Sequence, residues 1–186
     1  MYFITISEMF GTNGKKVAQG VAKALNYTFY GEEEKPKVYL DRLQSVIYEV
    51  AKKGDAVFFG RGSQLLLNSF GCALHVLITG SMEKRIQRAM EENRVSREVA
   101  EKMVHTYDHD RRGFVRFAFD QDWLNPHLYD LILNTDKLSI DSAVKMVMDA
   151  AKSDEIKACG IDSVKALGKL SLQRKVEAAF LEAGMA

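Results

Sequence analysis

The chain opens with a β-type segment that passes through a glycine-containing loop directly into a helix-type segment. Residues 2–6 are β-branched or aromatic, Gly11 and Gly14 follow, and apolar residues then recur at helical spacing over residues 17–25. A glycine turn at a helix N-terminus directs backbone N–H groups, and the partial positive charge of the helix, at an anion. This opening restricts the chain to folds built from β–loop–α units and predicts a phosphate-binding loop in residues 11–16.

The loop matches the P-loop pattern G-x-x-x-x-G-K-[ST] only in part. Gly14 and Lys15 fall on the central Gly-Lys pair. Met9 stands at the first glycine, and Lys16 stands at the hydroxyl residue that normally binds magnesium. An ordinary glycine turn between a strand and a helix is the alternative interpretation, and the position of the loop on the first strand favours the phosphate site.

Strand-type and helix-type segments alternate through the rest of the chain. Short apolar runs bounded by turn residues predict strands over residues 56–59, 74–78 and 129–133. Helical periodicity and capping residues predict helices over residues 15–25, 40–53, 81–93 and 139–151, and a further helix that opens at Ser96. Residues 63–70 are expected to contain a helix. Residues 26–37 are expected to be a connector. Such alternation is typical of a parallel sheet with helices on both faces.

Bulk composition limits the possible partners. The net charge of the 186 residues is +1, so no global basic field favours nucleic acid or an anionic membrane. No apolar run approaches membrane-spanning length, and the first residues do not resemble a signal peptide. The only two cysteines, Cys72 and Cys159, are expected to be reduced thiols. We therefore expect a cytoplasmic protein that binds neither membranes nor nucleic acid.

Three segments carry a resemblance to a known family. They are residues 6–15 (ISEMFGTNGK), residues 57–63 (VFFGRGS), and the pair DHDRR at 108–112 and DWLNPHLYDLILNTDKLS at 122–139. Over roughly residues 2–150 the chain resembles the cytidylate kinase-like family of P-loop nucleoside monophosphate kinases. The resemblance implies a three-layer α/β/α P-loop fold over residues 1–151, with a helical lid at about residues 81–120. Residues 152–186 would form a linker and a C-terminal helical tail.

The resemblance also implies functions for individual residues. Gly11, Thr12, Asn13, Gly14, Lys15 and Lys16 would bind the phosphates of ATP, accompanied by Mg²⁺. Lys15, Arg111 and Arg112 would be catalytic, and Arg61 and Arg111 would bind the acceptor. Asn134 and Thr135 would lie near the adenine. Gly62 departs from the family pattern, because cytidylate kinases carry an aspartate after the arginine.

Basic residues are concentrated in the middle of the chain. Phosphoryl transfer depends on positioning and on neutralising charge, for which arginine is well suited. We interpret Arg61 and Arg111 in this way because of their strand-end position and motif match. For Arg85, Arg88, Arg94 and Arg97, a solvated helix face is the favoured interpretation.

Two functions follow from these observations. The first is a phosphotransferase that uses ATP and Mg²⁺ to phosphorylate a nucleoside monophosphate (CMP-like or dCMP-like) or another small acceptor. The second is a non-catalytic sensor of nucleotides or other phosphorylated ligands with the same fold, which the substitutions at Met9 and Lys16 favour. The tail predicts an amphipathic helix with one apolar face, formed by Leu172, Val176, Ala179, Phe180 and Ala183, through which the chain could form a homo-oligomer.

Overall fold

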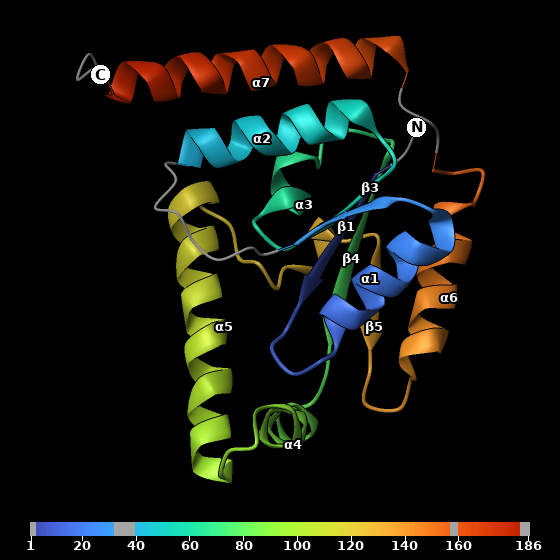
Figure 1. The fold of residues 1–186 in the computed structure, drawn as a ribbon, viewed down its shortest axis with the longest axis vertical. Coiled ribbons are helices and arrows are strands. Elements are labelled where there is room, and N and C mark those ends of the chain that lie inside the picture. Colours follow the sequence, from blue (N-terminus) through green and yellow to red (C-terminus); the bar gives the residue numbers. More distant parts are fainter. Residues whose placement is uncertain (1–2, 32–39, 157–159, 183–186) are drawn as a thin grey trace.

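The fold is built on a five-stranded parallel sheet. The computed structural model describes residues 3–31, 40–156 and 160–182. The strands lie in the order β2-β3-β1-β4-β5, and every neighbouring pair is parallel (Figure 1). Their bounds are β1 Phe3–Glu8, β2 Thr28–Tyr30, β3 Ala56–Phe59, β4 Ala73–Thr79 and β5 Leu131–Asn134. The predicted α/β class with a parallel sheet is confirmed.

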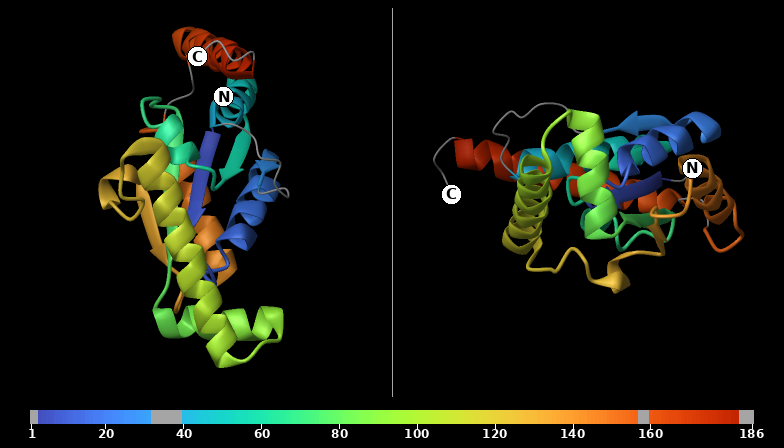
Figure 2. Two further views of the ribbon diagram at one scale, coloured as in Figure 1. Left: turned by 90° about the vertical axis from the view of Figure 1, so that its left-hand side faces the viewer. Right: turned by 90° about the horizontal axis from the view of Figure 1, so that it is seen from below.

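Helices connect the strands and cover both faces of the sheet. They are α1 Gly14–Leu25, α2 Leu40–Lys53, α3 Ser63–Leu66, α4 Met82–Asn93, α5 Arg97–Phe119, α6 Ile140–Ala151 and α7 Ile161–Glu182, with a 3-10 turn at Pro126–Leu128. Two views at right angles show α5 as a long rod beside the sheet, with α4 at one end of the rod (Figure 2). The three-layer arrangement expected for this fold is therefore present.

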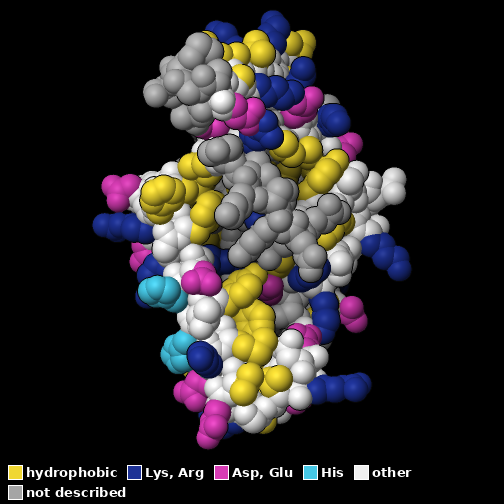
Figure 3. All heavy atoms as spheres, turned by 60° about the vertical axis from the view of Figure 1, so that its left-hand side comes forward, with side chains coloured by type: hydrophobic (Ala, Val, Ile, Leu, Met, Phe, Trp, Pro, Cys, Tyr) yellow, Lys and Arg dark blue, Asp and Glu magenta, His cyan; other side chains and the backbone are white. Residues whose placement is uncertain are grey.

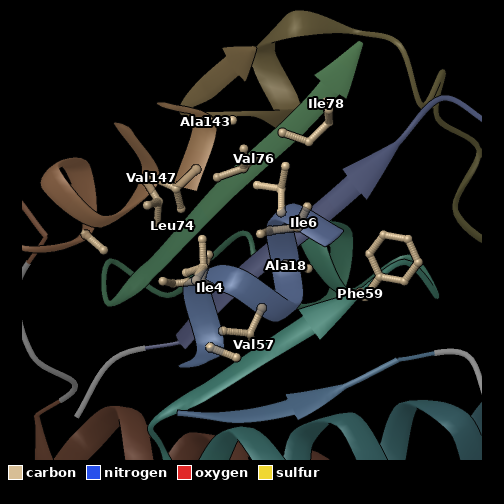
Figure 4. Packing of buried hydrophobic residues seen from close by; sticks show 14 of the residues in the cluster. Ile4, Ile6, Ala18, Val57, Phe59, Leu74, Val76, Ile78, Ala143 and Val147 are labelled. Carbon is tan, nitrogen blue, oxygen red and sulfur yellow. The ribbon is translucent and has the colours of Figure 1, made fainter. Parts of the chain in front are cut away.

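The first face of the sheet packs against α1 and α6. Figure 4 shows Ile4, Ile6, Val57 and other aliphatic strand residues pointing at Ala18 of α1 and at two residues of α6, all within one buried cluster. Burial of aliphatic side chains stabilises a fold by roughly 25 cal/mol per Å² of apolar area. This cluster holds the start of α1 against the sheet, and so it positions the glycine loop.

The second face packs against α2, α3 and α5. Phe3 and Phe58 of the strands contact residues of α2, α3 and α7 in one buried cluster. Leu77 of β4 packs with Val115 of α5 and with Trp123 in another. The long helix α5 is thus anchored to the sheet at its C-terminal end, and α4 and α5 pack on each other at the other end.

Most predicted elements are present, with shifts of at most two residues at their ends. The expected connector 26–37 was wrong in one respect: Thr28–Tyr30 forms the edge strand β2, which the sequence hides because it is only three residues long. Residues 32–37 of that connector lie outside the described part of the chain. The segment 63–70, which was expected to contain a helix, contains α3 over Ser63–Leu66.

The C-terminal helix is present, but it packs through a different face from the one predicted. Leu167, Ser171 and Ala178 are buried, whereas Leu172, Val176 and Phe180 are exposed. α7 lies along α2, and a hydrogen bond joins Ser171 Oγ to the Ser45 carbonyl at 3.1 Å (Figure 1). The helix therefore covers α2 with a face of small and aliphatic residues, and the predicted stripe faces outward. Ala183 of that stripe lies outside the described residues.

Two further expectations concern the environment of the protein. Cys72 is disulfide-bonded, so the expected reduced thiol is not found, and the only other cysteine, Cys159, lies outside the described residues. Across the part of the chain that the structure describes, no helix combines the length and apolar character needed to cross a membrane.

Candidate phosphate-binding site

The glycine loop lies between β1 and α1, where the parallel strands end. The Met9 N–H donates to the Ile78 carbonyl of β4 at 3.0 Å, and the Gly60 N–H after β3 donates to the Ile6 carbonyl at 3.0 Å. Ligands of open α/β sheets bind at this carboxyl edge. The structure therefore places the loop where the sequence predicted a phosphate site.

The backbone of the loop has a fixed, partly left-handed conformation. Gly11 has φ +79° and Asn13, which precedes α1, has φ 59°. The Thr12 hydroxyl lies 2.7 Å from the Met9 carbonyl oxygen, and the Thr135 hydroxyl donates to the Thr12 carbonyl at 2.9 Å. A left-handed residue just before a helix turns the next N–H groups inward. Thr135 therefore holds the loop in this structure, and its expected place near an adenine stays a prediction.

Arginines from two helices bind the carbonyl groups of the loop. Arg111 Nη1 donates to the Glu8 carbonyl at 2.7 Å, Arg85 Nε donates to the Phe10 carbonyl at 2.7 Å, and Arg88 Nη1 lies 3.3 Å from the Gly11 carbonyl. Because arginines bind these carbonyl groups, the N–H groups at the start of α1 are the polar groups of the loop that can bind an anion.

The solvated interpretation of Arg85 was wrong. Its side chain is 1% exposed and forms a two-pronged ion pair with Asp108, at 2.7 Å to each oxygen. Arg88 is also half-buried, between the loop and Thr135. Arg97 pairs with Glu83 at the surface, as predicted. Helical spacing cannot separate these cases, because only the tertiary structure sets Phe10 and Asp108 around Arg85.

An acidic side chain occupies the space that faces the start of α1. Glu8 ends β1, and its Oε2 accepts the N–H of Gly14 at 2.7 Å. The backbone N–H of Lys15 also donates to this carboxylate. The Thr12 hydroxyl lies 3.3 Å from the same Oε2 atom. Glu8 is 9% exposed, so the contact is largely shielded from water.

The electrostatic setting of Glu8 is mixed. Burial raises the pKa of this carboxyl above the usual glutamate range, while Arg111 and the hydrogen bonds from Gly14 and Lys15 act in the opposite direction. A carboxylate at a helix N-terminus interacts favourably with the helix dipole. The amides at the start of α1 therefore bind an anion in this structure, and that anion belongs to the protein itself.

The other predicted site residues lie around the loop to different degrees. Lys15 is exposed at the start of α1, and Lys16 forms an ion pair with Glu92 at 2.5 Å. The Arg111 guanidinium lies over the rings of Tyr107 and Trp123, 5.2 and 5.6 Å from their centroids. Arg112 is exposed on α5. The structure thus brings Arg111 and the backbone N–H of Lys15 to the Glu8 carboxylate.

Arg61 lies at the carboxyl end of β3, as predicted, in a strained backbone conformation. Its φ is 62°, and the next residue, Gly62, has φ +69°. A Cβ on Gly62 would lie 2.5 Å from the Phe119 ring. The aspartate that cytidylate kinases carry here would therefore collide with Phe119, which explains the glycine.

The residues fit the implied ATP and Mg²⁺ only in part. The loop offers amides and a lysine for phosphates, but Glu8 holds the Gly14 amide. Lys16 gives Mg²⁺ no hydroxyl ligand, and its charge would repel the ion. Within residues 3–31, 40–156 and 160–182, no three His, Cys, Asp or Glu side chains converge as a metal-binding group. In this conformation the loop does not accept a phosphate unless Glu8 moves.

The surface beside the loop is partly apolar. The ring centroids of Phe10 and Tyr107 lie 4.9 Å apart. Phe10 also packs against the buried residues between α4 and α5. In Figure 3 a strip of hydrophobic side chains runs down the lower part of the face shown, with charged side chains on both sides of it.

Sequence reasoning missed two residues at this site, Glu8 and Arg85. The signal for Glu8 was available: a carboxylate at the end of the first strand, next to a loop expected to bind phosphate, would repel that phosphate. Arg85 gave no signal, because its spacing matches that of the exposed basic residues around it.

Comparisons with known proteins identify the family and the fold. A sequence model described as the cytidylate kinase-like family matches residues 32–137, a span that begins after the glycine loop. No curated protein sequence gives a significant match.

Several solved structures share the fold. An uncharacterized protein from Eubacterium ventriosum is 20% identical with a TM-score of 0.71, covering 81% of this chain and 97% of its own. Shikimate kinase from Bacteroides thetaiotaomicron is 14% identical with a TM-score of 0.54, covering 82% and 99%. The YorR protein of Bacillus subtilis, in complex with phosphorylated GDP, is 12% identical with a TM-score of 0.53, covering 84% and 99%. These likenesses show a P-loop kinase fold.

Proposed function

The chain belongs to the cytidylate kinase-like family, and from this premise we propose that it is a phosphotransferase that moves the γ-phosphate of ATP, with Mg²⁺, to a small acceptor. A nucleoside monophosphate of the CMP or dCMP kind is the proposed acceptor, and other small acceptors are included in the test below. The observation that carries the proposal is the anion cradle at the start of α1. This cradle is formed by the backbone N–H groups of Gly14 and Lys15, which already hold the Glu8 carboxylate.

The chemistry of the site supports this proposal. Phosphoryl transfer requires positioned positive charge and little covalent chemistry from the protein. Lys15 would provide a mobile cation at the loop, and Arg111 would provide a fixed cation, held by Glu8 O and by two aromatic rings. Arg61 at the end of β3 would bind the acceptor, and Arg112 on α5 would add charge. ATP would supply the phosphoryl group when bound.

A direct assay tests the proposal. Phosphoryl transfer from ATP should be measured with CMP, dCMP, UMP, AMP and non-nucleotide alcohols such as shikimate, with and without Mg²⁺. We expect Lys15→Ala to lower kcat/KM by about a hundredfold or more, since one lost charge contact in a transition state has effects of this size.

Arg97→Ala is the matched control, because Arg97 is a surface cation paired with Glu83 on α4. We expect it to leave kcat/KM within about twofold, as exposed ion pairs contribute little. Equal losses in the two variants, or no transfer and no thermal stabilisation by any nucleotide, would refute the proposal.

A second candidate function is nucleotide or phosphate sensing without catalysis. One observation favours it: Lys16 replaces the hydroxyl residue of the loop pattern and pairs with Glu92. Under this alternative, nucleotides stabilise the protein against heat, Lys15→Ala removes that stabilisation, and no acceptor is phosphorylated. The same thermal and transfer measurements therefore separate the two functions.

A further inference from the structure

Glu8 raises a question that the proposed function leaves open, namely how a phosphate reaches amides that a carboxylate already holds. We propose that Glu8 is an internal competitor for phosphate: its carboxylate occupies the cradle until a ligand displaces it, and so Glu8 sets the affinity and selectivity of the loop for anions. This inference rests on the proposed phosphate site.

The Glu8 carboxylate and a bound phosphate need the same hydrogen-bond donors, the backbone N–H groups at the start of α1. Glu8 Oε2 lies 2.7 Å from the Gly14 nitrogen, which is hydrogen-bond distance, and the Lys15 N–H also acts on it. Those are the N–H groups that a loop and a helix N-terminus present to a phosphate. One N–H group cannot make a good bond to two anions, so binding of the ligand requires Glu8 to leave.

The Glu8 side chain is packed closely against Gly14 of the cradle. A Cβ on Gly14 would lie 2.5 Å from Glu8 Cβ and 2.8 Å from Oε2. Glycine at position 14 is therefore required by the glutamate side chain as well as by any ligand. The Thr12 hydroxyl, 3.3 Å from Oε2, closes another side of the carboxylate.

A phosphate beside a charged Glu8 would place like charges in a shielded site, where they repel each other strongly. Arg111 of α5 is the cation that acts on the Glu8 carboxylate, and it attracts either anion. The charge of Arg85 is neutralised by Asp108. Burial raises the pKa of Tyr129, which lies near Ser7, so this hydroxyl is uncharged. Neither side chain therefore offsets the repulsion between Glu8 and a phosphate.

The repulsion has a defined pH dependence. Burial raises the pKa of Glu8, so it takes up a proton at a higher pH than an ordinary glutamate. Protonation removes the negative charge, and the affinity for an anion should rise as the pH falls through this range. In Glu8→Gln the charge is absent at every pH, so this rise should be lost.

Sulfate is a suitable probe, because it is tetrahedral like phosphate and stays doubly charged across the neutral and mildly acidic range. Its binding can be followed by titration calorimetry and by the amide NMR signals of Gly14 and Lys15, which report on the cradle itself. At neutral pH we expect Glu8→Ala to bind sulfate at least about tenfold more tightly than the natural chain.

Further variants make the test specific. Glu8→Gln should also bind more tightly and lose the pH-dependent rise, and as an isosteric variant it serves if Glu8→Ala does not fold. Glu83→Gln, which removes a surface charge paired with Arg97, should leave the affinity within about twofold. Adding Lys15→Ala to Glu8→Ala should reverse the gain.

The outcomes distinguish this inference from the proposed function. Unchanged or weaker sulfate binding in folded Glu8→Ala and Glu8→Gln, with binding retained in the natural chain, overturns the competitor assignment and leaves the phosphate site standing. If no folded variant binds sulfate or ATP at millimolar concentration, both the phosphate site and the competition at it are overturned.

Discussion

Gly11 and Gly113 are both glycines, but Gly11 lies in a crowded loop and Gly113 lies in an open part of a helix. Gly11 has φ +79°, and a Cβ there would lie 2.6 Å from the Arg85 carbonyl oxygen. Gly113 lies inside α5, where a Cβ would meet no atom within 4 Å. Glycine in the loop is thus needed for conformation and space, whereas glycine in the helix only lowers helix stability.

This contrast gives a prediction for stability. Gly11→Ala should lower the free energy of unfolding by about 1–3 kcal/mol, through backbone strain and contact with α4. Gly113→Ala should raise it by up to about 1 kcal/mol, because alanine is a better helix former. Urea unfolding measures both, and a Gly11→Ala variant as stable as the natural chain would show that the loop conformation is not required.

Among the elements, α4 is held to the glycine loop by an arginine that few sequence criteria would single out. Arg85 joins α4 to the loop through Phe10 O and to α5 through Asp108. Two helices and the loop therefore meet at one buried guanidinium, and this arrangement fixes the loop carbonyls. Movement of α4 and α5 as a lid, which remains a prediction, would have to keep or break these contacts.

The element-scale prediction compares Arg85 with Arg97. Arg85→Ala should lower the free energy of unfolding by about 3–5 kcal/mol, because it leaves Asp108 without its partner in a shielded site. Arg97→Ala should lower it by less than about 1 kcal/mol, since the Arg97–Glu83 pair is exposed. The measurement is chemical denaturation of both variants, and similar values for the two would contradict the anchoring role of Arg85.

At the scale of the whole molecule, α7 is part of the packed structure. Leu167 of α7 is 0% exposed and belongs to a buried cluster with Ile47, Tyr48 and Phe70. Ion pairs from Arg174 to Asp41 and from Lys175 to Glu49 join α7 to α2. The division predicted at residue 151 therefore marks the end of α6, and α7 contributes to the same core as the sheet.

Substitutions on opposite faces of α7 test this view. Leu167→Ala should lower the free energy of unfolding by about 2–5 kcal/mol, because it opens a cavity in a buried cluster. Leu172→Ala, at a side chain that is 63% exposed, should change it by no more than about 0.5 kcal/mol. A negligible effect of Leu167→Ala in thermal or urea unfolding would mean that α7 does not stabilise the domain.

The homo-oligomer expected through the C-terminal helix stays a prediction. The outward stripe of Leu172, Val176 and Phe180 is the surface that such an assembly would use. Light scattering of the natural chain and of Phe180→Asp would decide it.

The sequence by itself determined the class of fold and the place of the site. Apolar strand runs, helix caps and the early glycines are local signals, and their spacing is enough to predict a parallel sheet with a loop at the start of α1. Lys15, Arg61 and the family resemblance were readable for the same reason. The short edge strand β2 was not, because three residues carry too little periodicity.

Only the tertiary structure decided what occupies the loop and what holds it. Arg85 is buried because Phe10 and Asp108, 75 and 23 residues away, meet at its guanidinium. Glu8 turns into the cradle because the backbone N–H of Gly14 is close enough to donate a hydrogen bond to its carboxylate. Such contacts depend on chain segments brought together by folding, so spacing along the sequence cannot reveal them. The loop was predictable, and the sequence shows a carboxylate next to it, whereas the hydrogen bond from the Gly14 amide to that carboxylate was not predictable.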